Sequence, residues 1–255
     1  MVRPKKHLGQ HFLVDQNIAR KITALLKAEN AVVLEIGPGT GTLTQYLIPR
    51  FTHNLWLVEI DTESVEYLKN KFPEYTGRII EGDFLQVSLN QLNTSPFAII
   101  GNFPYNISSQ IFFHILTHKE QVQEVVCMIQ KEVAERIAAG PGSKTYGILS
   151  VLLQTWYEIE YCFTINETVF HPPPKVKSAV IRLTRNSRTE LECNTGLFQH
   201  IVKMAFNQRR KTLRNALRSL IPPAMMHLEI LNKRAEQLHL NDFIQLTLTI
   251  EEATA

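Results

Sequence analysis

The sequence of 255 residues has few cysteines and no long hydrophobic run. Cys127, Cys162 and Cys193 form neither a CxxC pair nor a metal-ligand pattern, which excludes a disulfide framework and a cysteine metal site and favours a reducing compartment. No stretch approaches the roughly 20 apolar residues that a membrane span needs. Residues 1–7 lack the apolar segment of a secretory signal. We therefore expect a cytoplasmic protein.

Internal repeats and low-complexity tracts are also lacking. The hydrophobic content of 44% with 20% charged residues excludes a disordered chain. A chain of this length can bury one large core and add a small second domain.

Charge is unevenly distributed along the chain. Residues 1–170 carry 14 basic and 17 acidic side chains, whereas residues 171–255 carry 13 basic and 7 acidic ones. Residues 203–218 contain no acid and six basic side chains, Lys203, Arg209, Arg210, Lys211, Arg214 and Arg218. Such a segment is typical either of a surface that binds a polyanion or of a solvated helix face, and charge alone does not separate the two.

Short β-rich runs alternate with helical patterns over the first 150 residues, which predicts an α/β fold with a mainly parallel sheet. Strands are expected at residues 31–36, 55–60, 78–81, 97–101, 125–129, 157–164 and 178–184, and helices at 15–27, 42–48, 63–71, 131–139 and 146–154. Beyond residue 186 the pattern is helical. We expect a doubly wound, Rossmann-like sheet domain at residues 1–185 and a small basic helical domain at residues 186–255.

A glycine-rich turn, Gly37-Pro38-Gly39-Thr40-Gly41, separates the first of these strands from a helix. Glycines let the backbone approach a ligand closely, but similar turns also occur in NAD enzymes. Glu59, Asp83 and Asn102 end the next three strands, and the carboxyl ends of parallel strands meet at one cleft. Carboxylates suit a neutral or cationic ligand better than a pyrophosphate, so this pattern favours S-adenosylmethionine over NAD.

The segment Asn102-Phe103-Pro104-Tyr105 fits the [NDS]-x-P-[YF] motif of methyltransferases that act on exocyclic amines. The Asn102 side-chain oxygen and the Phe103 carbonyl can accept the two hydrogens of an adenine amine and direct its lone pair at a methyl donor. Pro104 has no N–H to compete, and Tyr105 offers a face for a flipped base. Alignment of donor and acceptor supplies most of the catalysis, so we expect no general base. A β-turn after a buried strand is the alternative for so short a motif.

With these residues, the chain resembles the KsgA-type rRNA adenine N6,N6-dimethyltransferases from near its start to about residue 220. The matching segments are KHLGQHFL at 6–13, EIGPGTG at 35–41, EID at 59–61, GD at 82–83, GNFPYNIS at 101–108, FHPPPKVKSAV at 170–180 and NQRRKTL at 207–213. The resemblance implies S-adenosylmethionine as methyl donor and 16S rRNA, in an immature 30S subunit, as substrate. The expected targets are two adjacent adenines in the 3′-terminal hairpin loop. We expect a monomer without a metal or a membrane contact.

The resemblance also implies roles for individual residues. The cofactor contacts are expected from His11, Leu13, Gly37, Gly39, Glu59, Asp83 and Asn102. The family usually has asparagine in place of His11, so the contact that carries over is one through its backbone. Phe170 matches an aromatic that stacks on the target adenine opposite Tyr105, and core packing is an equal alternative for it.

RNA contacts are implied for the basic residues Lys5, Lys6, Lys203, Arg209, Arg210, Lys211 and Arg214. A resistance methyltransferase that acts on large-subunit rRNA shares the fold and the N-x-P-Y motif, but residues 101–108 and 172–178 fit the KsgA type better. DNA methylation is disfavoured because nothing resembles a target-recognition domain. A binding-only factor is disfavoured by the intact Gly37, Glu59, Asp83, Asn102 and Tyr105.

Overall fold

The computed structural model describes residues 2–28, 31–89 and 96–254. The chain divides into two compact units, one of Met1–Ala134 with Glu158–Arg185 and one of Glu135–Tyr157 with Asn186–Ala255. The expected division into residues 1–185 and 186–255 therefore misplaced residues 135–157. These residues belong to the second unit because Tyr146 packs edge-on against Phe206 at 5.7 Å and the Asn186 N–H donates to the Trp156 carbonyl at 3.0 Å.

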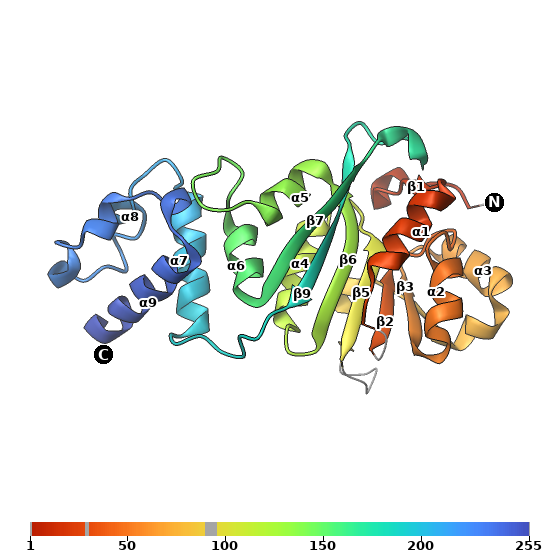
Figure 1. Ribbon diagram of the computed structural model, residues 1–255, viewed down its shortest axis with the longest axis horizontal. Coiled ribbons are helices and arrows are strands. Elements are labelled where there is room, and N and C mark those ends of the chain that lie inside the picture. The colour runs from red at the N-terminus through yellow and green to blue at the C-terminus, as the bar shows by residue number, and fades with distance from the viewer. Residues whose placement is uncertain (1, 29–30, 90–95, 255) are drawn as a thin grey trace. The chain divides into compact units, whose positions relative to one another are not determined.

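The first unit is built on a seven-stranded sheet in the order β4-β3-β2-β5-β6-β9-β7 (Figure 1). The strands are β2 Val32–Ile36, β3 Leu55–Glu59, β4 Ile79–Glu81, β5 Phe97–Asn102, β6 Val122–Gln130, β7 Tyr157–Ile165 and β9 Ser178–Arg185. Strands β4, β3, β2, β5 and β6 are parallel, and β9 is antiparallel to β6. All seven predicted strands are present, with ends shifted by up to three residues.

Helices α1 Gln16–Leu25, α2 Thr44–Phe51, α3 Thr62–Lys71, α4 Ser108–Thr117 and α5 Lys131–Ala138 follow the first strands. Asp15 caps α1 as expected, because its carboxylate accepts from the Asn17 and Ile18 N–H groups. Helices α1 and α2 share a core with one face of the sheet, where Val33 and Val126 are fully buried. Strand β2 is buried at every position and is apolar apart from Glu35, as expected for a parallel strand covered on both faces.

A second, two-stranded sheet was not predicted. Strand β1, Phe12–Leu13, pairs antiparallel with β8, Phe170–His171. Two residues are too few to show an alternating pattern, so the sequence carries no signal for this pairing. The pairing brings the N-terminal segment against the triproline segment, whose first peptide bond, His171–Pro172, is cis.

The second unit is helical, with α6 Ile148–Trp156, α7 Thr195–Asn207, α8 Leu213–Ala216 and α9 Leu240–Thr254 (Figure 1). Between α8 and α9 the chain forms only short 3-10 turns, which is less regular than the expected helical pattern. Within the described residues, no helix is long and apolar enough to cross a membrane.

Candidate active site

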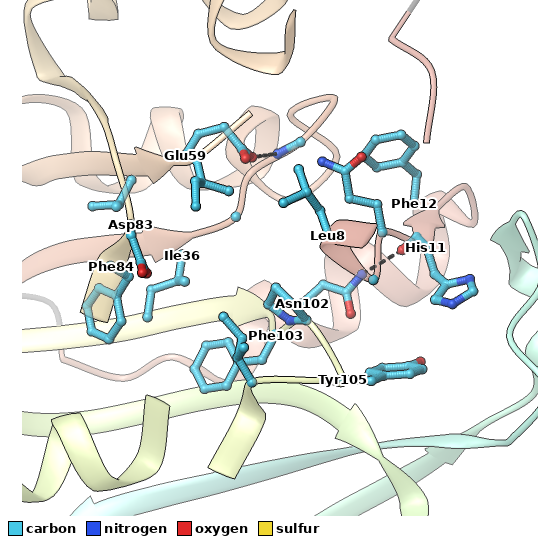
Figure 2. Close-up of a pocket in the computed structure, with 18 of the residues that line it drawn as sticks. Leu8, His11, Phe12, Ile36, Glu59, Asp83, Phe84, Asn102, Phe103 and Tyr105 are labelled. Atoms are coloured by element: carbon cyan, nitrogen blue, oxygen red, sulfur yellow. Dashed lines mark hydrogen bonds between the residues drawn. The ribbon is translucent and has the colours of Figure 1, made fainter. Parts of the chain in front are cut away.

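A cavity that is open to solvent lies at the carboxyl ends of β2, β3, β4 and β5. Its walls come from residues 8–12, the glycine turn and the segments that follow β3, β4 and β5 (Figure 2). The lining includes nearly all of the predicted cofactor and catalytic residues, His11, Gly37, Gly39, Glu59, Asp83, Asn102, Phe103, Pro104 and Tyr105. The structure therefore brings the separately predicted motifs into one site.

The glycine turn and Glu59 form one wall of this cavity. Gly37 and Gly39 have φ values of 63° and 56°, in the left-handed region that favours glycine. The Glu59 carboxylate accepts from the Gly39 N–H at 2.9 Å and from the Asp61 N–H at 2.9 Å. Burial raises the pKa of Glu59, and the two backbone N–H groups oppose that shift. A carboxylate held in this way keeps lone pairs that can accept from ribose hydroxyls.

Asp83 and apolar side chains line the part of the cavity that follows β4. One oxygen of Asp83 accepts from the Leu85 N–H at 2.9 Å, and the second oxygen is able to accept from an adenine amine. Phe84 and Ile60 line the cavity beside it, and Ile60 is 50% exposed. An exposed isoleucine on a cavity wall is a surface that a flat base can cover.

The charge of the lining suits a cationic cofactor. Among the described residues that line the cavity, Glu59 and Asp83 are acidic and none is lysine or arginine. A pyrophosphate would need cations or a cluster of backbone donors there, whereas the sulfonium of S-adenosylmethionine carries a positive charge. The residues present therefore fit S-adenosylmethionine.

Asn102, the last residue of β5, is held by the N-terminal segment. Its side-chain Nδ2 donates to the His11 carbonyl at 2.8 Å, which leaves Oδ1 as the acceptor of this amide (Figure 2). The Phe103 N–H donates to the Met128 carbonyl at 3.0 Å, and the fully buried Phe103 ring packs edge-on against Phe112. The turn of the motif is thus fixed to β6 and to the core.

Tyr105 lies beside Asn102 at the open end of the site. Its hydroxyl hydrogen-bonds the Ser178 Oγ at the start of β9, and burial raises the pKa of the phenol. The His11 imidazole stacks on the Tyr105 ring, with the ring centroids 5.5 Å apart and an interplanar angle of 27°. The Nδ1 of His11 lies 2.8 Å from the Pro172 carbonyl, which can only accept, so Nδ1 carries the proton.

Comparison with known proteins identifies the family. Residues 1–252 match the family model described as ribosomal RNA adenine dimethylase. The chain belongs to this family. Its class I methyltransferase fold, its adenine dimethyltransferase activity and its use of S-adenosylmethionine are therefore as the sequence predicted.

Three similar proteins illustrate this family membership. The chain is 56% identical over 251 residues to ribosomal RNA small subunit methyltransferase A of Parabacteroides distasonis, covering 97% of this chain and 94% of the relative. The crystal structure of a dimethyladenosine transferase from Plasmodium falciparum has a TM-score of 0.80 at 26% identity, covering 95% of this chain and 98% of that one. The crystal structure of the 23S rRNA methyltransferase ErmE has a TM-score of 0.67 at 25% identity, covering 92% and 99%.

Two predicted site residues of this family member lie in its core instead. Leu13 and Phe170 are 4% and 3% exposed and share one hydrophobic cluster. They are partners in the β1–β8 pairing, and neither is among the described residues that line the cavity. The Phe170 side chain therefore packs in the hydrophobic core, which was the alternative to a stacking role. The backbone carbonyl of Leu13 accepts from Thr42 Oγ1 at 3.0 Å.

The N-terminal lysines, both expected to contact RNA, lie in different surroundings. Lys5 forms an ion pair with Asp61, whose side chain is fully buried, and the hydrogen bond to Asp61 raises the pKa of Lys5. Gln10, which the sequence analysis did not single out, lines the cavity and donates to the second Asp61 oxygen at 3.3 Å. Its place in the matching segment KHLGQHFL was the available signal. Lys6 is exposed.

The basic residues of the second unit also separate into two groups. Arg209 donates to the Ser143 carbonyl at 3.1 Å, and Arg214 donates to the Met226 carbonyl and to Asn232 Oδ1. These two guanidinium groups join segments within the unit. Within residues 203–218, the exposed basic side chains are Lys203, Arg210, Lys211 and Arg218.

Proposed function

We propose that this protein adds two methyl groups to N6 of each of two adjacent adenines in the 3′-terminal hairpin loop of 16S rRNA. We place the reaction in the cytoplasm, on an immature 30S subunit, and the enzyme acts as a monomer. The observation that carries the proposal is the orientation of Asn102. Because Nδ2 is bound to the His11 carbonyl, Oδ1 is the atom that is available to an adenine amine beside Tyr105.

The protein contributes binding and alignment. Glu59 and Asp83 hold S-adenosylmethionine, which supplies a methyl group already activated by the sulfonium. Asn102 Oδ1 and the Phe103 carbonyl accept the two hydrogens of the target amine, which draws its lone pair out of conjugation with the ring. Alignment of this kind can account for about 7–11 kcal/mol of a barrier, so no side chain needs to act as a general base, and the proton that the methylated amine loses passes to water.

Two observations support small-subunit rRNA over the large subunit. The relative from P. distasonis, named for the small subunit, is 56% identical, whereas ErmE, named for 23S rRNA, is 25% identical. The segments 101–108 and 172–178 that favour the KsgA type both contribute to the acceptor end of the site, through Tyr105, Pro172 and Ser178. Unpaired bases of a hairpin loop are less costly to flip than paired ones, which suits a site that holds one base.

The experiment that tests this proposal offers the purified enzyme undermethylated small and large ribosomal subunits with labelled S-adenosylmethionine. We expect label in the small subunit only, and mass spectrometry of its 3′-terminal 16S fragment should place two methyl groups on each of two neighbouring adenines. Label confined to the large subunit would contradict the substrate assignment. Size-exclusion chromatography with light scattering tests the monomer.

A further inference from the structure

We propose that the buried Asp61 is a positioning residue for methyl transfer. Its side chain holds the N-terminal turn, residues 5–11, and this turn places the His11 carbonyl that orients the Asn102 amide. The inference rests on the proposed function, because it concerns the acceptor that Asn102 offers to the target amine. Asp61 acts through the N-terminal turn and not through a contact with the cofactor or the base.

The carboxylate of Asp61 is occupied by groups of the protein itself, and its side chain is 0% exposed. Oδ1 accepts from the Lys5 ammonium and from the Glu63 N–H at 3.3 Å. Oδ2 accepts from Gln10 Nε2 at 3.3 Å and from Ser64 Oγ at 2.9 Å. These four donors fill the roughly four lone-pair positions of a carboxylate. Asp61 is also outside the described lining of the cavity, so its side chain supports the site without binding a ligand.

Two of the four donors, Lys5 and Gln10, belong to the N-terminal turn. Burial raises the pKa of Asp61, but the hydrogen bonds from Lys5, Ser64 and Gln10 outweigh that effect and lower the pKa below its ordinary value. The buried carboxylate is therefore charged. A buried charge that loses its partner is strongly unfavourable, so Asp61 fastens the turn at both Lys5 and Gln10.

The N-terminal turn carries this restraint to His11. The Lys5 N–H donates to Gln10 Oε1 at 2.8 Å, so the Gln10 amide binds the start of the turn with its oxygen and Asp61 with its nitrogen. His11 is the next residue, and its carbonyl accepts from Asn102 Nδ2 at 2.8 Å (Figure 2). A shift of the turn at Asp61 therefore also shifts the carbonyl that orients the amide.

The N-terminal turn also packs tightly against the catalytic motif at a second place. Gly9 has a φ of 65°, and a Cβ atom added to it would lie 2.7 Å from Asn106 Oδ1. Asn106 directly follows Tyr105 in the motif. Because not even a methyl group fits between the turn and the motif, a displacement of the turn is transmitted to the motif.

The test uses the full-length enzyme and undermethylated small subunits in single-turnover reactions at saturating S-adenosylmethionine. Lys5→Met removes the charge of the side chain and keeps its length, whereas Lys5→Arg keeps the charge. Asp61→Asn removes the partner charge and retains both a residue that can cap α3 and the backbone N–H that holds Glu59. The matched control is Glu66→Gln, which removes an exposed carboxylate of α3 that pairs with Lys69.

A further variant, Gly9→Ala, displaces the N-terminal turn without removing a charge. It keeps the test decisive if the charge variants fail to bind the cofactor. Each substitution is also made in the Asn102→Ala background. This double-mutant cycle separates an effect that passes through the amide from one that does not.

We expect Lys5→Met, Asp61→Asn and Gly9→Ala to lower the single-turnover rate about 10- to 100-fold, because misplacing a reacting group by about 1 Å has an effect of this size. The KM for the RNA should change less than this rate, and Lys5→Arg should react at nearly the wild-type rate. In the Asn102→Ala background the same substitutions should cause no further loss, because the amide that they misplace is already absent. Glu66→Gln should match the wild type.

Two results would overturn the proposal. Wild-type rates at saturating cofactor in all three variants would show that the N-terminal turn serves cofactor binding alone. A further loss of the same fold in the Asn102→Ala background would show that Asp61 acts independently of the amide. If the enzyme labels only the large subunit, the substrate assignment fails, and the same comparison on that subunit tests Asp61 separately.

Discussion

The side-chain amide of Asn102 donates to the backbone carbonyl of His11, 91 residues earlier in the chain, at 2.8 Å. This contact ties the N-terminal segment to the catalytic motif and, because it occupies the amide nitrogen, leaves the oxygen available to a substrate. An unconstrained asparagine could present either its oxygen or its nitrogen to a substrate amine, and only the oxygen helps the reaction.

Replacement of Asn102 tests this relationship directly. We expect Asn102→Ala to lower kcat at least about 100-fold, comparable to the loss of one preorganised polar group in other enzymes. RNA binding should change little, because the stacking surface of Tyr105 remains. Single-turnover kinetics and a filter-binding assay measure the two quantities. Methylation by the variant at the wild-type rate would remove Asn102 from the mechanism.

Glu59 is expected to determine affinity for the cofactor. In Glu59→Gln the amide would place an N–H group against either the Gly39 or the Asp61 N–H, which both donate to the carboxylate now. We expect the dissociation constant for S-adenosylmethionine to rise about 10- to 100-fold, because this is the effect of losing one hydrogen bond to a charged group. Titration calorimetry measures this constant. The exposed Glu74→Gln is the control, and equal constants for both variants would contradict the assignment.

Lys5 and Lys6 are adjacent and should behave differently. Lys5 is paired with the buried Asp61, so Lys5→Ala should loosen the attachment of the N-terminal segment to Asp61 and weaken cofactor binding. The salt dependence of RNA binding should stay unchanged. Lys6 is exposed, and Lys6→Ala should reduce the slope of log K against log salt by about one if it contacts a phosphate. The reverse pattern would show that Lys5 contacts the RNA.

The exposed pair Arg210 and Lys211 should bind phosphate, whereas Arg209 should stabilise its own unit. We expect Arg210→Ala with Lys211→Ala to weaken RNA binding and to lower the salt slope by about two with Tm unchanged. Arg209→Ala should lower Tm, because its guanidinium bonds the Ser143 carbonyl. Lys69→Ala, which removes a surface charge paired with Glu66, is the control for total charge. An unchanged slope in the double variant would make this segment an ordinary solvated face.

Glu35 gives the protein a specific pH dependence. Burial in β2 raises the pKa of Glu35 to about 8, although Thr44 Oγ1 donates to it at 2.7 Å. The unfolded chain has a pKa near 4.5, so the native state binds the extra proton between these values. The free energy of unfolding should therefore fall as pH rises from about 4.5 to about 8, on the order of a few kcal/mol.

Glu35→Gln isolates that contribution. The variant keeps an acceptor for Thr44 but does not titrate, so its stability relative to the wild type should increase steadily between pH 5 and pH 8. Denaturant unfolding at several pH values measures the difference. The exposed Glu74→Gln is the matched control. A difference between Glu35→Gln and wild type that is constant with pH would show that Glu35 is ionised in the folded protein throughout.

Much of the cavity was predictable from sequence because Glu59 and Asn102 end strands of a parallel sheet and Asp83 follows the end of another. Once buried runs such as β2 and β5 are recognised, the geometry of the sheet brings these side chains together. Local pattern and chain order were sufficient for that part of the site.

The other features depend on contacts between distant segments. The core position of Phe170 follows from its pairing with Leu13, and two-residue strands have no pattern to detect. The ring of His11 is directed to Tyr105 by a carbonyl on Pro172, 161 residues away. Likewise, the sequence shows Arg209 and Arg210 as equivalent charges, and only the fold shows that Arg209 is bound to Ser143.

The most direct test is mass spectrometry of the 3′-terminal fragment of 16S rRNA from a strain that lacks this gene, complemented with the wild-type gene or with Asn102→Ala. We predict two methyl groups on each of two neighbouring adenines with the wild-type gene, and none without the gene or with the variant. Dimethylated adenines in the strain that lacks the gene would contradict the proposed substrate. Dimethylation at the wild-type level with Asn102→Ala would contradict the role of the amide that His11 holds in place.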